Sequence, residues 1–355
     1  MRKAINIILV AVVTWLLTCC ISQPDGKLTT PAENFESLWT TLDERYCYFD
    51  EKAIDWDSVY AVYKEKVGKI AADNERALFD TLSSMVNILR DGHVNLISPF
   101  DVSRYSAFYD AYPRNYNSSV VYNNYLKERM TAGPFVYGII DSDYGYMSYS
   151  SFSDGYSPLN MYYVLSYFFM ENKCKGLIID VRNNTGGSIE NALYLASYFF
   201  PRDTVAVYLQ HKTGKGHNDF SEPEPLMIDR KKHSASFVDV PVVVLTNRLC
   251  YSATNLFVCA MKQCKRCKVI GDKTGGGGGI PLGYELPNGW MIRFSSVKMT
   301  DTQHKSIEDG IEPDIKQDIV TTGKDDILEK GMEEILSRKS KVEGLKPGML
   351  YIVER

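Results

Sequence analysis

Ser252, in the segment LCYSATNLF (residues 249–257), follows the apolar run VPVVVL and opens a segment with helical character. A serine at the start of a helix is by default an N-cap, which needs no further chemistry. With a base beside it, the same hydroxyl can be the nucleophile of an acyl transfer. The backbone N–H of Ala253, at the helix start, would then face the oxygen that becomes anionic. Both interpretations of Ser252 stay open on this segment alone.

His93 is the histidine best suited to be the base. It lies in LRDGHVNL (residues 89–96), between a glycine and an apolar strand start. A lone histidine at such a place is more typical of a helix C-terminus than of a catalytic base. A third group that orients the imidazole would strengthen the case, and KSIEDGIEPDI offers Glu308, with Asp309 and Glu312 nearby. The other histidines lie in polar stretches and are interpreted as surface residues: His211, His217, His233 and His304.

Gly186 and Gly187 are adjacent in DVRNNTGGS (residues 180–188), where a strand pattern gives way to a helix pattern. Such a turn can present backbone N–H groups to a developing oxyanion. The alternative is a tight turn that needs glycine only for its dihedral angles.

The elements that must position these residues indicate an α/β fold. Helical periodicity covers residues 34–49, 56–70 and 73–93, with Asp73 as the expected N-cap of the third helix. Further along, strand patterns alternate with helix patterns, which is typical of α/β layering. The expected elements are a strand pair in 137–152, strands at 177–180, 240–246 and 268–273, helices at 188–200 and 252–264, a hairpin at 284–299 and a terminal helix at 325–338.

Four segments, taken in order, resemble the S41 serine peptidases, which include the C-terminal processing peptidases and the tricorn-type core. They are LIIDVRNNTGG, LCYSATNLF, VIGDKTGGGGG and GIEPDI, and LRDGH upstream resembles the histidine segment of the tricorn-like branch. The resemblance implies an α/β fold with a ββα spiral core of the ClpP/crotonase class and an N-terminal helical cap. Many members carry a PDZ domain, for which residues 94–135 are too few.

The resemblance also implies roles for single residues. Ser252 matches the nucleophile, His93 the base and Glu308 the orienting acid, with Asp309 as the open alternative to Glu308. The oxyanion donors would be Ala253 and one of the two glycines, Gly186 or Gly187.

Two departures from the family pattern bear on these roles. Gly277 stands where the processing peptidases have a lysine base, and Lys273 lies four residues earlier, so a Ser–Lys dyad is disfavoured. Gly92 stands where the tricorn-type pattern has a serine, so a supporting hydrogen bond would be lost.

The N-terminus reads as an export signal with a lipobox. MRK is followed by a short apolar run and then LTCC, which places Leu17 three residues before Cys20, the expected lipidated residue. A plain cleaved signal or an uncleaved anchor is the alternative. The expected location is the cell envelope, with the chain lipid-anchored to a membrane and facing the periplasm or the cell exterior. The expected organisation is a signal peptide (1–20), a tether (21–33), a helical cap (34–92), a connecting segment (93–135), a peptidase core (136–320) and a C-terminal helix and tail (321–355).

The net charge and the cysteine spacing limit which ligands and cofactors are expected. The net charge of −4 does not indicate a nucleic-acid-binding protein, which would be expected to carry a basic surface. Cys264 and Cys267 form a single Cys-x-x-Cys without a second ligand pair, so neither a metal site nor any other cofactor is expected. Whether these two cysteines form a disulfide stays open.

These observations favour a surface-tethered serine endopeptidase acting on peptides or proteins. The alternative is a non-catalytic peptide- or glycan-binding lipoprotein on the same fold, since fold does not imply function. A scaffold subunit of an envelope nutrient-uptake system is neither supported nor excluded. The sequence leaves the substrate and the oligomeric state open.

Overall fold

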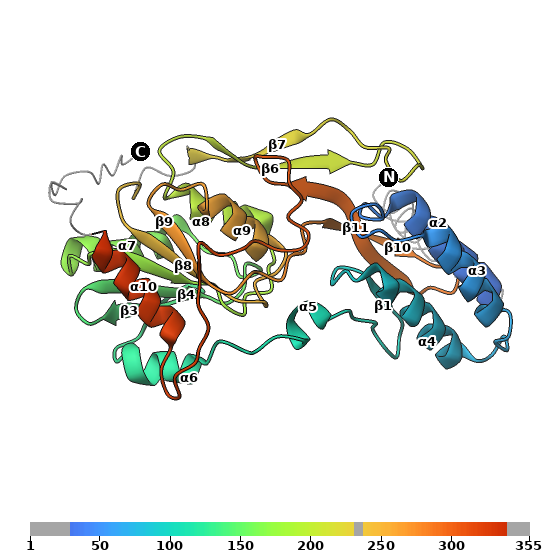
Figure 1. Cartoon of the computed structure of the whole chain (residues 1–355), viewed down its shortest axis with the longest axis horizontal. Coiled ribbons are helices and arrows are strands. Elements are labelled where there is room, and N and C mark those ends of the chain that lie inside the picture. Colours follow the sequence, from blue (N-terminus) through green and yellow to red (C-terminus); the bar gives the residue numbers. More distant parts are fainter. Residues whose placement is uncertain (1–28, 231–236, 339–355) are drawn as a thin grey trace, which may run out of the picture.

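A seven-stranded sheet forms the centre of the larger part of the molecule (Figure 1). The computed structural model describes residues 29–230 and 237–338. Neighbouring strands are parallel from β12 to β4, and β3 and β2 continue the sheet antiparallel. The strands, in sheet order, are β12 (Ile315–Lys316), β9 (Cys267–Gly271), β8 (Val242–Thr246), β5 (Gly176–Asp180), β4 (Tyr144–Tyr149), β3 (Phe135–Ile140) and β2 (Met130–Ala132).

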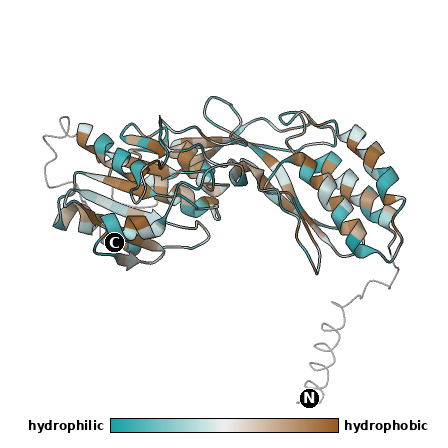
Figure 2. Ribbon diagram, turned by 60° about the horizontal axis from the view of Figure 1, so that its bottom comes forward, coloured by the Kyte–Doolittle hydropathy of each residue, from teal (hydrophilic) through white to brown (hydrophobic). Residues whose placement is uncertain are grey.

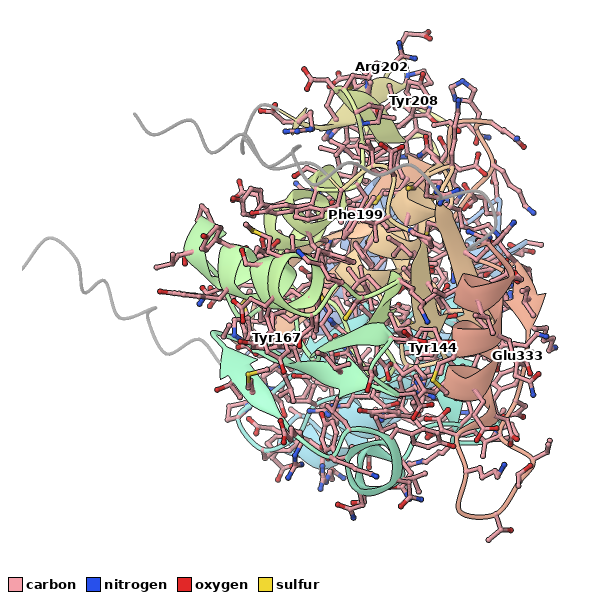
Figure 3. The ribbon with its side chains drawn as sticks, turned by 90° about the vertical axis from the view of Figure 1, so that its left-hand side faces the viewer. Tyr144, Tyr167, Phe199, Arg202, Tyr208 and Glu333 are labelled. Atoms are coloured by element: carbon pink, nitrogen blue, oxygen red, sulfur yellow. The ribbon has the colours of Figure 1, made fainter. Side chains whose placement is uncertain are left out.

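Helices cover both faces of this sheet, which explains why its central strands are almost wholly apolar. Leu177 and Ile179 of β5 belong to the core under α8 and α9, whereas Ile178 between them packs toward α10. Figure 3 looks onto this end of the molecule and shows Glu333 of α10 on one side and Phe199, just after α8, on the other. The helices are α7 (Pro158–Ser166), η3 (Tyr167–Glu171), α8 (Ile189–Ser197), α9 (Ala253–Met261) and α10 (Asp326–Ser337).

A second, five-stranded sheet carries the N-terminal helices at the other end of the molecule (Figure 1). Apolar residues of β11 and of the turn before it share one core with these amphipathic helices, whose hydrophobic and hydrophilic residues alternate around the axis (Figure 2). The strands are β1 (Asn95–Ile97), β11 (Met291–Thr300), β6 (Thr204–His211), β7 (Glu224–Ile228) and β10 (Ile280–Glu285). The helices are α2 (Pro31–Arg45), α3 (Trp56–Val67), α4 (Glu75–Val86) and η1 (Asn87–Leu89).

Short helical turns lie in the segment that links the two parts. They are α5 (Ala107–Asp110), α6 (Ser118–Val120) and η2 (Val121–Tyr125). In Figure 1, α5 lies between the helical end and the seven-stranded sheet. The chain passes from the helical end to the seven-stranded sheet in this segment. Residues just before it therefore lie near the carboxyl ends of the parallel strands.

Most of the predicted elements are confirmed, including the alternation of strands and helices and the hairpin with its turn at Asn288 and Gly289. The prediction of Asp73 as an N-cap was wrong. Asn74 caps α4 instead, because its side chain accepts the N–H of Ala77. Strands β6 and β7 were not predicted.

The proposed export signal and Cys20 lie outside the described residues. Within residues 29–230 and 237–338, no helix has the length and apolar character that crossing a bilayer requires.

Candidate active site

Ser252 stands at the start of α9 in a strained backbone conformation. Its φ of 58° and ψ of −122° are rare for a residue with a side chain, and its hydroxyl makes no capping hydrogen bond to the helix. Its N–H donates to the carbonyl of Gly276, and the preceding N–H of Tyr251 donates to the carbonyl of Asn184. Both neighbouring loops therefore hold the turn that exposes the hydroxyl. The N-cap interpretation of Ser252 does not describe this geometry.

His93 lies beside Ser252, although the two residues are 159 positions apart. The His93 Nε2 is 3.0 Å from the Ser252 Oγ, within hydrogen-bond reach of a base for its nucleophile. His93 is 2% exposed. Burial lowers the pKa of His93 to about 4, the charges of Arg293 and Lys52 add to this, and Asp91 opposes it. The imidazole is therefore neutral near pH 7 and can accept a proton.

Asp91 is the acid nearest to His93 along the chain, and it is buried. Its Oδ1 accepts the backbone N–H of His93 at 2.7 Å and the hydroxyl of Tyr251 at 3.3 Å. Its Oδ2 accepts the hydroxyls of Ser295 at 2.8 Å and Tyr46 at 3.2 Å. Four donors therefore fix the position of this one carboxylate. Asp91 thus fixes the backbone of His93 and places a negative charge near its ring.

Glu308 does not take the place that the sequence suggested for it. Its Oε1 pairs with the Lys52 Nζ at 2.8 Å, and its Oε2 accepts the N–H of Gly278 at 2.8 Å. The ring Nδ1 of His93, which an orienting acid would bind, has no hydrogen-bond partner among the described residues. Burial and the nearby Asp91 raise the pKa of Glu308, while Lys52 and the Gly278 N–H lower it. The expected Glu308–His93 contact is therefore replaced by an ion pair to Lys52.

Tyr251 fills the space between the two glycines that depart from the family pattern. A Cβ on Gly92 would lie 2.8 Å from the Tyr251 hydroxyl, and one on Gly277 would lie 2.5 Å from the Tyr251 ring. The Tyr251 ring also stacks on Phe108 at 4.5 Å and lies 4.9 Å from the His93 ring. Both glycines are thus needed because this tyrosine packs where side chains would stand.

The two glycines of the first turn differ in what their N–H groups do. The Gly186 N–H donates to the Asn184 Oδ1 at 3.0 Å. No such bond is found for the N–H groups of Gly187 and Ala253 within the described part of the chain. Both of these residues line the same cavity as Ser252. The geometry therefore favours Gly187 over Gly186 as an oxyanion donor, with Ala253 as the second.

The cavity at Ser252 has a volume of about 540 Å³. Its lining also includes apolar side chains, one arginine and two other polar residues: Ile189, Ile280, Pro281, Met299, Arg293, Glu190 and Thr185. A second cavity of about 490 Å³ lies beyond Tyr251 and is lined by Lys52, Glu308 and Lys273, among others. Lys273 pairs there with Glu312 at 3.4 Å, so the structure does not bring this lysine to Ser252.

The cysteines and other metal-ligating groups form no metal cluster in residues 29–230 and 237–338. Cys264 and Cys267 are both buried and free, so the question of a disulfide between them is answered in the negative for this structure.

Sequence reasoning missed Asp91, Tyr251 and Arg293. The first two were within reach, because Asp91 belongs to the LRDGH segment and Tyr251 immediately precedes Ser252. Arg293 lies on β11, and no local pattern links that strand to the site.

Comparisons with known proteins agree on one family. The profile of Peptidase family S41 matches residues 143–317, and that of the tricorn protease C1 domain matches residues 29–87. The crystal structure of a candidate peptidase from Parabacteroides merdae ATCC 43184 is 41% identical, covers 87% of this chain and 98% of its own, and superposes with a TM-score of 0.81.

Two further proteins are similar to smaller parts of the chain or at lower identity. A candidate CtpA-like serine protease of Staphylococcus haemolyticus (strain JCSC1435) is 31% identical over 40% of this chain, which spans only 27% of that relative's length. A lipoprotein from Streptococcus agalactiae is 17% identical, covers 87% of this chain and 97% of its own, and has a TM-score of 0.56, which shows a shared fold.

Proposed function

Because the chain belongs to peptidase family S41, we propose that it is a serine endopeptidase that hydrolyses peptide bonds through an acyl-enzyme. The observation that carries this proposal is the 3.0 Å contact between the His93 Nε2 and the Ser252 Oγ. The imidazole of His93 is buried and neutral, and the Ser252 hydroxyl does not cap the helix. This arrangement lets the imidazole take the hydroxyl proton and so activates the oxygen for nucleophilic attack.

The reaction begins when Ser252 attacks the carbonyl carbon of the scissile bond and its hydroxyl proton passes to the His93 Nε2. The carbonyl oxygen becomes anionic and accepts hydrogen bonds from the N–H groups of Gly187 and Ala253, which line the cavity beside Ser252. His93 then gives the proton to the leaving amine, the C–N bond breaks and the acyl group stays on Ser252. Water, deprotonated by His93, hydrolyses the ester and restores the hydroxyl.

Asp91 takes over the part that Glu308 was expected to play. A protonated His93 is costly in a buried site, and a fixed negative charge lowers that cost. Asp91 is the group that raises the pKa of His93, and its carboxylate is itself held by four donors. Asp91 acts through the backbone and the electric field, so it is a positioning residue.

The proposal places the mature protein in the cell envelope, lipid-anchored through Cys20. The support is the lipobox pattern of the sequence and the shared fold with the Streptococcus agalactiae lipoprotein. The non-catalytic binding protein is the disfavoured alternative, because a binding module has no need of a strained serine against a buried imidazole.

Intact-mass spectrometry after treatment with a fluorophosphonate tests the activation of Ser252. We expect one adduct on the wild-type protein and none on Ser252→Ala or His93→Ala. Ser83→Ala is a matched control, because Ser83 is a helical serine that does not line the cavity, and it should label like the wild type. A folded wild-type protein that stays unlabelled would favour the binding protein.

A further inference from the structure

Arg293 is a half-buried cation in the wall of the cavity that holds Ser252. It lies on β11, between Asn95 of β1 and Gly283 of β10 in the strand register. Its side chain lines the same cavity as Ser252 and His93. It is also close enough to His93 for its charge to lower the pKa of that imidazole. Arg293 is thus positioned to meet whatever occupies this cavity.

The guanidinium of Arg293 has no acidic partner in the described part of the chain. Its one hydrogen bond runs from Nη1 to the Asn95 Oδ1 at a long 3.4 Å. The charge of Asp91 acts on it from a distance, but both oxygens of Asp91 are already taken by other donors. Arg293 is therefore a desolvated cation without an ion pair.

Two other buried or half-buried arginines, Arg182 and Arg248, are paired with carboxylates. Arg182 contacts Asp180 at 2.7 Å and Asp325 at 2.8 Å, and Arg248 contacts Asp272 at 3.0 Å. Removing a guanidinium from water costs free energy that a carboxylate partner offsets. Arg182 and Arg248 have such a carboxylate partner. Arg293, which lines the cavity of Ser252, has none among the described residues.

Carboxylate is the chemistry that fits the free guanidinium. Arginine presents a planar fork of donors that binds a carboxylate through two parallel hydrogen bonds. Apolar side chains form another part of the wall, through Ile189, Ile280 and Pro281. Glu190 also lines the cavity but is exposed, at the start of α8, so it disfavours a carboxylate on its own side. The cavity thus suits an apolar segment with one acidic group on the β11 side.

We propose that Arg293 binds a carboxylate of the peptide substrate in the cavity of Ser252, so that the enzyme selects peptides that present a carboxylate there. This inference rests on the proposed peptidase function and names its substrate class. The carboxylate belongs to an aspartate or glutamate side chain or to the peptide C-terminus, since the two share this chemistry. A bound carboxylate would also neutralise the charge of Arg293 that disfavours protonation of His93, which couples recognition to proton transfer.

Binding to the Ser252→Ala protein tests the inference without turnover. Fluorescently labelled peptides would be compared in matched pairs, with glutamate against glutamine at each internal position and with a C-terminal acid against an amide. We expect one pair to show roughly 10- to 100-fold tighter binding of the carboxylate peptide, as a charge-assisted pair implies. The pair that responds identifies the source of the carboxylate.

The preference should disappear in Ser252→Ala/Arg293→Gln and partly return in Ser252→Ala/Arg293→Lys. Arg76 pairs with Asp101 at the surface, so Ser252→Ala/Arg76→Gln is the matched control and should keep the full preference. Equal affinities within every pair, or a preference that survives Arg293→Gln, would overturn the inference. The fluorophosphonate adduct on Arg293→Gln reports separately on Ser252, so a labelled protein without carboxylate preference refutes only the inference.

Discussion

The Tyr251 hydroxyl lies 2.8 Å from the point that a Cβ on Gly92 would occupy. Tyr251, which immediately precedes Ser252, therefore fills the place where the tricorn-type pattern has a serine side chain. Its hydroxyl binds Asp91 at 3.3 Å, and its ring borders His93. The lost serine is thus accompanied by a different support for the histidine, built from Tyr251 and Asp91.

Enlarging Gly92 should destabilise the protein through this contact. Gly92→Ala would overpack the site against Tyr251 and Phe108, at a cost of about 1–3 kcal/mol in the free energy of unfolding. Gly155→Ala is the control, since no atom of the described residues lies within 4 Å of the place that its Cβ would take, and it should change stability by less than about 0.5 kcal/mol.

A double-mutant cycle of Gly92→Ala with Tyr251→Ala, followed by urea denaturation, attributes the cost to the contact. The alanine at Gly92 should be tolerated better once the tyrosine is gone. If the two substitutions changed the free energy of unfolding strictly additively, Tyr251 would not be the group that excludes a side chain at position 92.

The acid limb of the pH–rate profile should lie well below the ordinary pKa of histidine, 6.5. Burial lowers the pKa of His93 to about 4, and the neutral imidazole is the active base. The value of kcat/KM should therefore rise with pH through about 4 and level off before neutrality. Arg293→Gln should move the limb to higher pH, because Arg293 lowers the pKa of His93. A limb near 6.5 in the wild type would contradict the buried, neutral base.

Asp91→Asn should lower kcat while the protein stays folded. The substitution removes the negative charge that raises the pKa of His93, so kcat should fall by roughly 10-fold or more and the acid limb should move to lower pH. Tyr46→Phe removes only one of the donors to Asp91 and should cost about 1 kcal/mol of stability with little effect on kcat. An Asp91→Asn enzyme with wild-type kcat and acid limb would remove Asp91 from the account.

Glu308→Gln should act on stability, because Glu308 pairs with Lys52 instead of His93. Breaking a buried ion pair by removing one partner costs about 3–5 kcal/mol. Lys52→Met/Glu308→Gln, which leaves no charge unpaired, should recover part of that loss in thermal or urea unfolding. Folded Glu308→Gln should still form the fluorophosphonate adduct. Loss of the adduct at full stability would instead support the orienting role that the sequence suggested.

The sequence was most informative where periodicity is local. The strand at Val242–Thr246 and the helix after Ser252 follow from apolar runs and helical spacing, and motif order was enough to single out Ser252 and His93. The acid that supports His93 could not be chosen between Glu308 and Asp91 from the sequence. The two carboxylates differ in their partners, and only the tertiary fold determines these. Arg293 was out of reach for the same reason, since it comes to the cavity through the pairing of β11 with β1 and β10.

We propose above that Ser252, activated by His93, cuts peptide bonds. The most direct measurement is digestion of a diverse peptide library, read by mass spectrometry, with wild type, Ser252→Ala and His93→Ala compared at equal concentration. We expect new peptide termini with the wild type and none above background with either variant. An intact library with the folded wild type, or cleavage that persists in Ser252→Ala, would contradict it.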